Sequence, residues 1–350
     1  MKIAQVVSGQ ESVPPKHKNG AEFIVSWLTE EFINRGHEVT LFATGDSKTK
    51  AKLVSIFPTS LTNDKNPPLP QPFVSLWNTL LAASHGSEFD IIHSHTISTV
   101  FGMPFVGETP VVETLHSSFS TPEKNTANLR FVSEQFQKIN YVSVSNNQLQ
   151  EFNKFYKNNA TKSRNIYNGI PVERFEFENT PKDYLLYIGY INKNKGADTA
   201  VRVARKLGMK LILAGANYFE EEFFEKEIKP YLNDKIKYIG PIDFKEKIEL
   251  YKNAYATLAP ISWSEPFGLT LVESQASGTP VIAFNKGAAS EIIDNGKTGY
   301  VVESEEEMIN KVKEVETLNR QDCREWVEKN FSVRKMVDEY EKLYKSLIKK

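Results

Sequence analysis

The chain has 350 residues, which at about 150 residues per domain predicts two domains, and 40% of them are hydrophobic, enough for two packed cores. Its 43 Lys and Arg residues nearly balance 44 Asp and Glu residues, so no long-range field draws it to nucleic acid or to an anionic membrane. The single cysteine, Cys323, excludes an internal disulfide, a tetrathiolate zinc site and an iron–sulfur cluster.

Short β-branched runs alternate with helical stretches along the chain, which is typical of an α/β protein with a parallel sheet covered by helices on both faces. In the first half the predicted strands are Ile3 to Val7, Glu38 to Ala43, Leu53 to Phe57, Asp90 to His93, Pro110 to Leu115, Tyr141 to Val144 and Ser163 to Tyr167. In the second half they are Tyr184 to Ile188, Lys210 to Ala214, Ile236 to Ile239, Ala256 to Ala259, Val281 to Ala283 and Gly299 to Val302. Helices are predicted over Ala21 to Arg35, Phe73 to Ala83 and Val333 to Ile348.

A break in composition at Pro171 to Lys182 predicts the linker between two doubly wound domains, 1–168 and 169–332. Ligands of open parallel sheets bind beyond the carboxyl ends of the strands. Two such domains facing each other would line one central cleft, so the residues just after the strands are the first candidates for a site.

The beginning of the chain has too short an apolar run for a signal peptide, and no run approaches about 18 apolar residues. We therefore expect a cytoplasmic protein without an integral membrane segment. Peripheral contact with a membrane stays open, because Lys154, Lys157, Lys162 and Arg164 form a modest basic cluster around Phe155 and Tyr156. A solvated helix face explains that cluster equally well.

The densest chemical signal follows the strand that ends near Pro260. Glu265 precedes Pro266, a good first-turn residue, and Glu273 would lie on the helix that follows. Gly268 lets an anion approach the free amides at the start of that helix. Carboxylates repel phosphate, so the two acids are better suited to accept hydrogen bonds from neutral hydroxyl groups. A site for both hydroxyl groups and phosphate indicates a nucleotide sugar as the ligand. The alternative is a helix-start acid at Glu265 and a solvated residue at Glu273.

The string SWSEPFGLTLVESQASGTPVIAFNKGAASEIIDNGKTGYVV closely resembles the signature region of glycosyltransferase family 4, retaining enzymes of the GT-B fold. The blocks INYVSVSNNQLQEF, NIYNGIPVERF, DYLLYIGYINKNKG and IKYIGPIDFKEKIELYKNA are similar to the same family. The resemblance implies two Rossmann-like domains facing a central cleft, an acceptor-side domain first and a donor-binding domain second. It also implies that the last helix, within 333–350, packs back on the first domain, whereas by its pattern alone it could equally be an edge helix of the second.

The resemblance also implies roles for residues of the second domain. Glu265 would hold hydroxyls of the donor sugar and Glu273 those of the ribose. Backbone groups would contact the rest of the donor, with amides offered by Phe267, Gly268 and Leu269 and the nucleobase contacted around Gly240 and Ile242.

A second site follows the strand Tyr184 to Ile188. A diphosphate leaving group needs a fixed cation to neutralise it, and we choose Lys195, for which a solvated charge is the alternative. The family usually places Arg where Tyr190 stands. Three explanations for this difference are left open: Lys193 takes the place of the arginine, Tyr190 donates a hydrogen bond to the phosphate, or the activity is weak. No Asp-x-Asp sequence occurs, which weakens a metal-dependent alternative and leaves only scattered ligands open. We expect no cofactor beyond the nucleotide-sugar co-substrate, and no required metal.

The first domain contributes a small-residue loop and three histidines. Gly20, in the loop Asn19 to Glu22, would let the diphosphate or the acceptor approach, and ESVPPK before it resembles a family subgroup. The string VVETLHSSF resembles the acceptor-side loop whose His contacts the donor sugar, which favours His116 as a site residue over His93 and His95. Those two make a poor zinc site without a third donor. Ser145 and Asn146 are interpreted as helix caps.

Together these features predict a retaining glycosyltransferase that moves a sugar from a nucleoside diphosphate sugar, with UDP favoured by its frequency in the family. The acceptor would be a hydroxyl of a small molecule or a glycan. A non-catalytic nucleotide-sugar-binding subunit and a GT-B sugar-nucleotide epimerase are the alternatives. An NAD-dependent dehydrogenase is disfavoured, because Ser8 to Glu11 lacks the glycine-rich dinucleotide turn.

Overall fold

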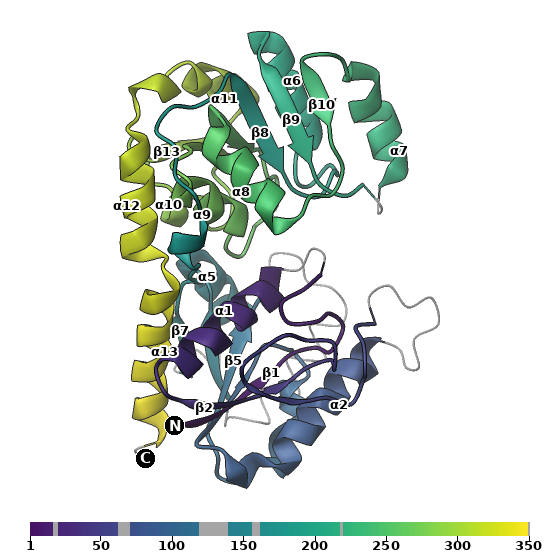
Figure 1. Ribbon diagram of the computed structural model, residues 1–350, viewed down its shortest axis with the longest axis vertical. Helices are drawn as coiled ribbons and strands as arrows, with labels where there is room; N and C mark the ends of the chain where they lie inside the picture. The colour runs from purple at the N-terminus through teal and green to yellow at the C-terminus, as the bar shows by residue number, and fades with distance from the viewer. Residues whose placement is uncertain (17–19, 62–70, 119–138, 156–161, 218–219, 349–350) are drawn as a thin grey trace. The chain divides into compact units, whose positions relative to one another are not determined.

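The computed structural model describes residues 1–16, 20–61, 71–118, 139–155, 162–217 and 220–348. The chain forms two compact units, Met1–Gly169 together with Val333–Lys350, and Ile170–Ser332. The division falls between Gly169 and Ile170, one residue after the predicted boundary. Figure 1 shows the elements of both units in the order of the chain.

The first unit contains a seven-stranded sheet in the order β3-β2-β1-β4-β5-β6-β7. Every pair of neighbouring strands is parallel. The strands are β1 (Lys2–Val6), β2 (Glu38–Phe42), β3 (Lys52–Val54), β4 (Ile91–Ser94), β5 (Val111–Leu115), β6 (Ile139–Ser143) and β7 (Ser163–Asn165). The order reverses between β1 and β4, which is where an open α/β sheet offers its ligand-binding crevice.

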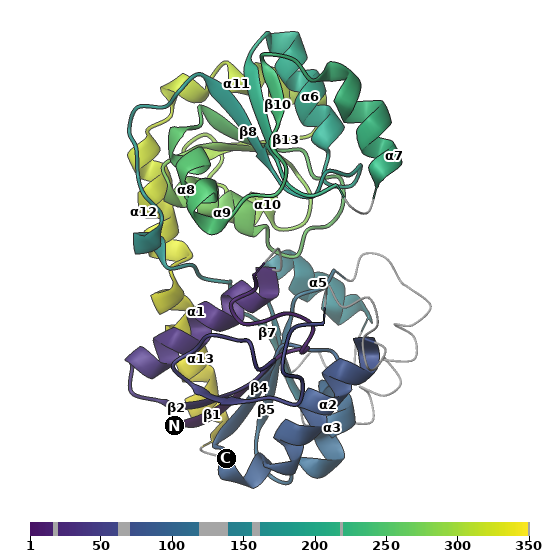
Figure 2. The ribbon, with the colours of Figure 1, turned by 45° about the vertical axis from the view of Figure 1, so that its right-hand side comes forward.

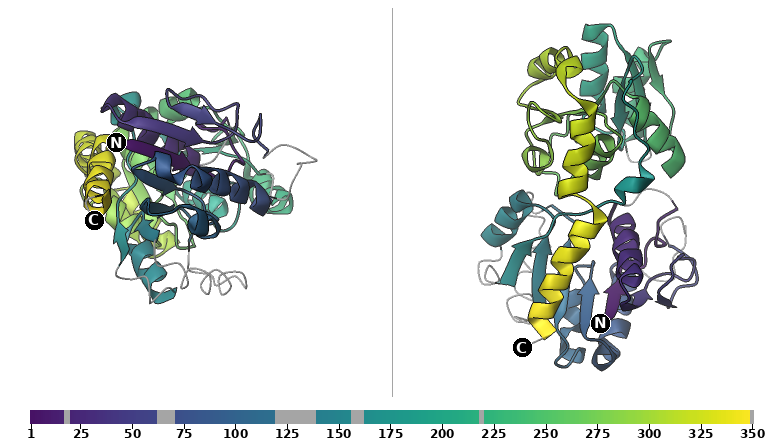
Figure 3. Two further views of the ribbon diagram at one scale, coloured as in Figure 1. Left: turned by 90° about the horizontal axis from the view of Figure 1, so that it is seen from below. Right: turned by 60° about the vertical axis from the view of Figure 1, so that its left-hand side comes forward.

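Helices cover both faces of this sheet. They are α1 (Gly20–Asn34), α2 (Gln71–Ser84), α3 (Thr99–Gly102), α5 (Asn146–Phe155) and α13 (Val333–Ile348). Helix α2 lies beside α3, while α13 lies beside α1 (Figures 2 and 3). The last helix therefore packs on the unit that holds the first residues of the chain.

The periodicity of α13 explains how it is anchored. Met336, Tyr340 and Tyr344 recur at steps of four and are buried, whereas Lys335 and Lys342 on other sides of the helix are exposed. The ring of Tyr344 lies 5.6 Å from that of Phe32 on α1, centroid to centroid. An apolar stripe on a sixteen-residue helix is thus buried by a partner some three hundred residues earlier in the chain.

The second unit contains a six-stranded parallel sheet in the order β10-β9-β8-β11-β12-β13. Its strands are β8 (Tyr184–Ile188), β9 (Lys210–Ala214), β10 (Ile236–Tyr238), β11 (Ala256–Ala259), β12 (Val281–Phe284) and β13 (Gly299–Val302). Here the order reverses between β8 and β11, so the loops that follow these two strands leave the sheet side by side.

The helices of the second unit are α6 (Ala197–Leu207), α7 (Glu221–Phe223), α8 (Phe244–Asn253), α9 (Leu269–Ala276), α10 (Ala289–Ile292), α11 (Glu305–Val312) and α12 (Arg320–Asn330). Helix α6 contacts α11, and α9 contacts both α8 and α12, which puts these two groups on opposite faces of the sheet (Figure 1). Side chains that alternate along β8 serve both layers: Leu185 packs with the α6 side and Leu186 with Tyr251 of α8.

Each predicted strand is present in the described residues, with ends that differ by a few positions. The largest difference is at β3, predicted over Leu53 to Phe57 and observed over Lys52–Val54. Beyond Val54 the chain bends at Ile56 and Phe57, and the carbonyl of Phe57 accepts a hydrogen bond from the amide of Gly45 outside the sheet, 2.8 Å. The predicted α/β fold with two doubly wound domains is confirmed.

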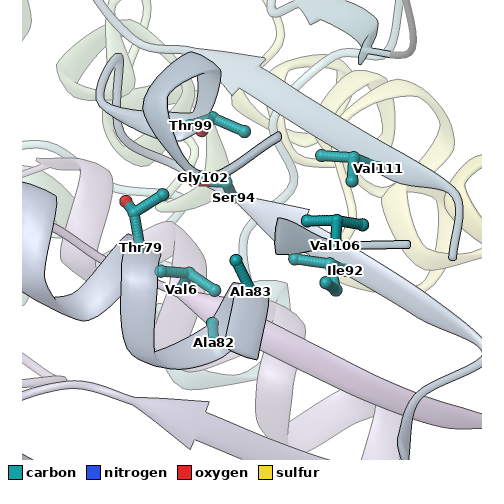
Figure 4. Close-up of a pocket in the computed structure, with 10 residues that line it drawn as sticks. All are labelled: Val6, Thr79, Ala82, Ala83, Ile92, Ser94, Thr99, Gly102, Val106 and Val111. Atoms are coloured by element: carbon teal, nitrogen blue, oxygen red, sulfur yellow. The ribbon is translucent and has the colours of Figure 1, made fainter. Parts of the chain in front are cut away.

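A small cavity lies beneath α2 and α3 in the first unit. Figure 4 shows that the side chains around it, among them Val6, Ile92, Val106 and Val111, offer carbon almost exclusively. Its volume of about 10 Å³ holds at most one water molecule. This cavity is a packing feature of the core and is too small for a substrate.

Candidate functional site

Two loops meet where the strand order of the second unit reverses. One follows β8 and carries Lys195, and the other follows β11 and carries Glu265. The amide of Ser262 donates to the carbonyl of Asn194, 2.9 Å, which ties the loops together. A Cβ atom on Gly196 would clash with the carbonyl of Pro260, and its φ of 75° also favours glycine. The close approach of the loops therefore depends on that residue.

Lys195 and Glu265 form an ion pair, with 2.5 Å between Nζ and Oε2. Both side chains are partly buried, with exposed fractions of 22% and 19%. The Lys195 ammonium also lies 5.0 Å from the ring centroid of Trp263, within the range of a cation–π contact. The solvated charge considered for Lys195 is therefore wrong, and the two residues predicted for separate loops are partners.

The start of α9 has the features expected of an anion site. Gly268 is its N-cap, with a φ of 89°, and no side chain caps the helix there. The Phe267 side chain is buried and packs edge-on against Phe331. The first amides of α9 and the positive end of its dipole are thus available to a phosphate group.

Glu273 lies one turn further along α9 and is 3% exposed, which rules out the solvated residue considered above. Its Oε1 atom lies 2.6 Å from Nζ of Lys247, and its Oε2 atom accepts a hydrogen bond from the Tyr251 hydroxyl, 3.2 Å. Burial, with the neighbouring Glu273 carboxylate, raises the pKa of Tyr251 well above its usual value, so the phenol stays protonated and donates.

Sequence reasoning missed Lys247 and Tyr251. They stand four residues apart on α8 and therefore on one face of it. The sequence shows that spacing, but it does not show that this face of α8 contacts Glu273, which follows Tyr251 by 22 residues and Lys247 by 26.

The other predicted residues of this unit lie in neighbouring loops. The Tyr190 carbonyl accepts a hydrogen bond from the Tyr187 hydroxyl, 2.7 Å, while the Lys193 side chain is exposed. Gly240 follows β10 with a φ of 75°, and its carbonyl accepts from the amide of Gly215, 2.8 Å. Ile242 follows in the same loop and is partly exposed.

The turn Gly287 to Glu291 supports the site from behind. A Cβ atom on Gly287 would clash with the backbone of Glu265, and Gly287 has a φ of 55°. The amide of Ala288 donates to the Glu265 carbonyl, 3.1 Å. The turn is thus a structural element that fixes the backbone of Glu265.

In the first unit, His116 follows β5 directly and is partly exposed. Its Nε2 atom lies 3.0 Å from Nδ1 of His95. Burial lowers its pKa to about 4, so His116 is a neutral imidazole near pH 7. The structure places Ser145 where a cap is expected, since its hydroxyl accepts from the amide of Gln148, 3.1 Å.

Gly20 begins α1, and Glu22 lies in its first turn. Within the described residues, Oε2 of the buried Glu22 has no hydrogen-bond partner, and its Oε1 accepts from the Ser8 hydroxyl at 3.4 Å. Burial, assisted by the charge of Glu11, raises the pKa of Glu22 to about 7. Asn19 lies outside the described residues, as do Tyr156 and Lys157 of the basic cluster.

No group of three or more His, Cys, Asp and Glu side chains is arranged to hold a metal ion in the part of the chain that the structure describes. No described helix is both long enough and apolar enough to cross a membrane.

Comparison with known proteins matches each half of the chain to a glycosyltransferase domain. The family model "Glycosyltransferase Family 4" matches residues 18–174, and "Glycosyl transferases group 1" matches residues 171–332. An uncharacterized glycosyltransferase of Methanocaldococcus jannaschii is 23% identical over 344 residues, which cover 86% of this chain and 85% of that protein.

Solved structures share the fold over the full length. Sucrose-phosphate synthase from Thermosynechococcus elongatus is 20% identical with a TM-score of 0.80, covering 99% of each chain. HepE of Anabaena, in complex with UDP-glucose, is 17% identical with a TM-score of 0.77, covering 99% of this chain and 100% of that one. The two parallel-sheet domains of this chain are therefore those of the GT-B fold.

We expect Lys247→Met to destabilise the protein by about 3 to 5 kcal/mol, because it leaves the buried Glu273 carboxylate without its cation. Lys252→Met on the same helix is the matched control. Lys252 pairs with Glu176 and Glu249, which are exposed, so its loss should cost at most about 1 kcal/mol. Chemical denaturation measures both, and equal effects would contradict the importance given to the Lys247–Glu273 pair.

The pH dependence of stability should reveal Glu22. The pKa of Glu22 is raised in the folded protein, so folding favours its neutral carboxyl. Below about pH 4.5 the carboxyl is neutral in the folded and the unfolded states and the protein has its full stability. Part of that stability is lost as the pH rises through about 7, because the buried carboxyl must then ionise. From pH 5 to pH 9 the wild type should lose about 3 kcal/mol relative to Glu22→Gln. Denaturation at a series of pH values measures this. The exposed Glu38→Gln is the control, and parallel curves for wild type and Glu22→Gln would disprove the assignment.

Proposed function

We propose that this chain, a glycosyltransferase of the GT-B fold, transfers a sugar from a nucleoside diphosphate sugar to a hydroxyl group. One observation carries the proposal: Lys195 and Glu265 pair at 2.5 Å beside the uncapped start of α9. A cation and helix amides suit a diphosphate, and a carboxylate suits sugar hydroxyls. A nucleotide sugar is the ligand that presents both groups a few bonds apart.

The diphosphate would bind at the start of α9, against the backbone amides of Phe267, Gly268 and Leu269. Lys195 would exchange the carboxylate of Glu265 for a phosphate oxygen as the donor enters. This exchange makes Glu265 available to accept hydrogen bonds from the sugar. Lys195 then neutralises the charge that develops on the diphosphate as the glycosidic bond breaks.

Glu273 would hold the ribose. Two carboxylate oxygens offer about four acceptor positions, and Lys247 and Tyr251 use one on each oxygen. The remaining positions can accept from the two ribose hydroxyls. Because Lys247 and Tyr251 also fix its orientation, the carboxylate binds without a further loss of side-chain freedom.

We propose a UDP-sugar as the donor, which the UDP-glucose bound in the similar Anabaena structure supports. The base would contact the backbone around Gly240 and Ile242, and His116 would contact the sugar. Transfer would retain the anomeric configuration, with the departing phosphate taking the proton of the acceptor hydroxyl. Lys195 and the helix amides supply the positive charge for this step, so the proposed reaction uses no metal.

The family models that match the two halves of the chain are both models of glycosyltransferases. A non-catalytic binding subunit and a sugar-nucleotide epimerase are therefore not favoured. The acceptor is proposed only by class, as a hydroxyl of a small molecule or of a glycan.

Binding of the nucleotide tests the donor site. UDP and UDP-glucose should raise the melting temperature, since a ligand at about 100 times its dissociation constant adds about 2.7 kcal/mol of stability. GDP and ADP, tested at the same concentration, should have smaller effects. No shift with any of the nucleotides or their sugars would contradict the proposed function, and a larger shift with GDP or ADP would overturn the choice of UDP.

Lys195→Ala should lower turnover of UDP-glucose at saturating donor by about 10²-fold, on the scale of losing one preorganised electrostatic contact. Lys210→Ala is the matched control, because Lys210 is exposed and pairs with the exposed Asp183 on the same unit. Coupled detection of released UDP measures both. Normal turnover by Lys195→Ala would show that the diphosphate is neutralised by another group.

A further inference from the structure

The motif His93-Ser94-His95 has no part in the proposed reaction, yet it leads directly to His116. Nδ1 of His95 lies 3.0 Å from Nε2 of His116, and Nε2 of His95 lies 2.9 Å from Oε1 of Gln5. The other end of the Gln5 amide, Nε2, lies 3.4 Å from Nδ1 of His93. The Tyr344 hydroxyl lies 2.6 Å from the same His93 nitrogen.

These contacts form an unbroken chain from α13 to His116, which we call the histidine relay: Tyr344, His93, Gln5, His95 and His116. The sheet dictates this order, because Gln5 and His93 are paired residues of the neighbouring strands β1 and β4. Gln5, His93 and Tyr344 are each fully buried. Their contacts therefore persist without competition from water, which makes them stronger and more directional.

A branch of the relay holds His93 from its other side. Nε2 of His93 lies 2.7 Å from the Thr114 hydroxyl, which lies 2.7 Å from the Tyr340 hydroxyl. Both ring nitrogens of His93 are thus engaged. Two tyrosines of α13, one turn apart, fix this ring in place.

The relay determines which nitrogen of each ring carries a proton. Burial keeps the pKa of His95 well below its usual value and that of His116 at about 4, so each neutral ring has one donor and one acceptor. Oε1 of Gln5 can only accept, so Nε2 of His95 must donate to it. Nδ1 of His95 is then the acceptor, and Nε2 of His116 donates to it. Nδ1 of His116 is left as an acceptor.

We propose that the histidine relay positions His116: Gln5, His95 and, from the last helix, Tyr344 hold its imidazole in one orientation and one tautomer, with Nδ1 presented to a hydroxyl of the donor sugar. The inference rests on the proposed function, since it takes His116 as the sugar contact. Gln5, His95 and Tyr344 are positioning residues, because each acts through the next one in the relay.

Turnover of UDP-glucose tests the coupling. His95→Phe keeps a ring but removes both nitrogens, and it should lower kcat about three- to tenfold, the effect of one lost hydrogen bond, with little change in KM. In a His116→Ala background the same change should have no further effect. Additive losses in the two backgrounds would overturn the proposal, because residues that act through one another are not additive.

Three further variants separate positioning from folding. His95→Asn keeps an acceptor at the place of Nδ1 and should restore most of the activity that His95→Phe loses. Gln5→Leu tests the next link if His95→Phe lowers the melting temperature sharply. Tyr184→Phe removes a hydroxyl that donates to the carbonyl of Leu250 at 2.7 Å in the second unit, and it should leave kcat unchanged. Failure of His95→Asn to exceed His95→Phe would count against the relay.

Nuclear magnetic resonance tests the relay without any donor, so its result is independent of the proposed function. The chain has six histidines, and single variants assign their ¹⁵N-labelled rings. In the wild type we expect His116 with its proton on Nε2 and a bare Nδ1. In His95→Phe the Nε2 proton loses its acceptor, and the two ring nitrogens should shift toward averaged values. A proton on Nδ1 in the wild type, or an unchanged His116 in His95→Phe, would overturn the proposal.

Discussion

The candidate site depends on one close approach, that of the loops after β8 and β11. Parallel neighbours place the two loop starts side by side, and glycine at 196 then lets one backbone pass against the carbonyl of Pro260. Without that approach, the ammonium of Lys195 would not reach Glu265. Gly287 applies the same constraint from the other side of Glu265. Backbone packing at these two glycines therefore determines whether the charged side chains of the site can meet.

The sequence predicted much of this architecture, because alternating β-branched runs and helical stretches identify strands individually. It also identified Lys195 and Glu265 as candidates. It did not show that they are partners, because the two residues are 70 positions apart in the chain. Their pairing follows from the strand order, which places β8 beside β11. Local patterns determine the elements, whereas the order of strands within the sheet determines which loops meet.

Lys247 and the histidine relay show the same limit in a different form. The acid at Glu273 is buried, so it requires a cation, but nothing local to Glu273 says that α8 supplies it. In the first unit the contact between Gln5 and His93 joins residues 88 apart, and that between His93 and Tyr344 joins residues 251 apart. Polar residues that have no distinctive pattern in the sequence acquire specific partners because the folded core brings together strands and helices that are distant along the chain.

The last helix, α13, must both bury an apolar stripe and satisfy the hydrogen bonds of two buried phenols. Its apolar stripe favours burial of Tyr340 and Tyr344, yet each phenol then needs a hydrogen-bond partner in the interior. The partners are a threonine and a histidine on adjacent strands, so the hydroxyl groups are satisfied only when α13 docks in one register. Shifting the helix by one turn would keep its apolar stripe on the sheet but would put Met336 or Ile348 in the place of one tyrosine, which leaves a buried polar atom unpaired at a cost of about 1 to 3 kcal/mol. Apolar burial brings the helix to the sheet, and the hydrogen bonds select the register that completes the relay to His116.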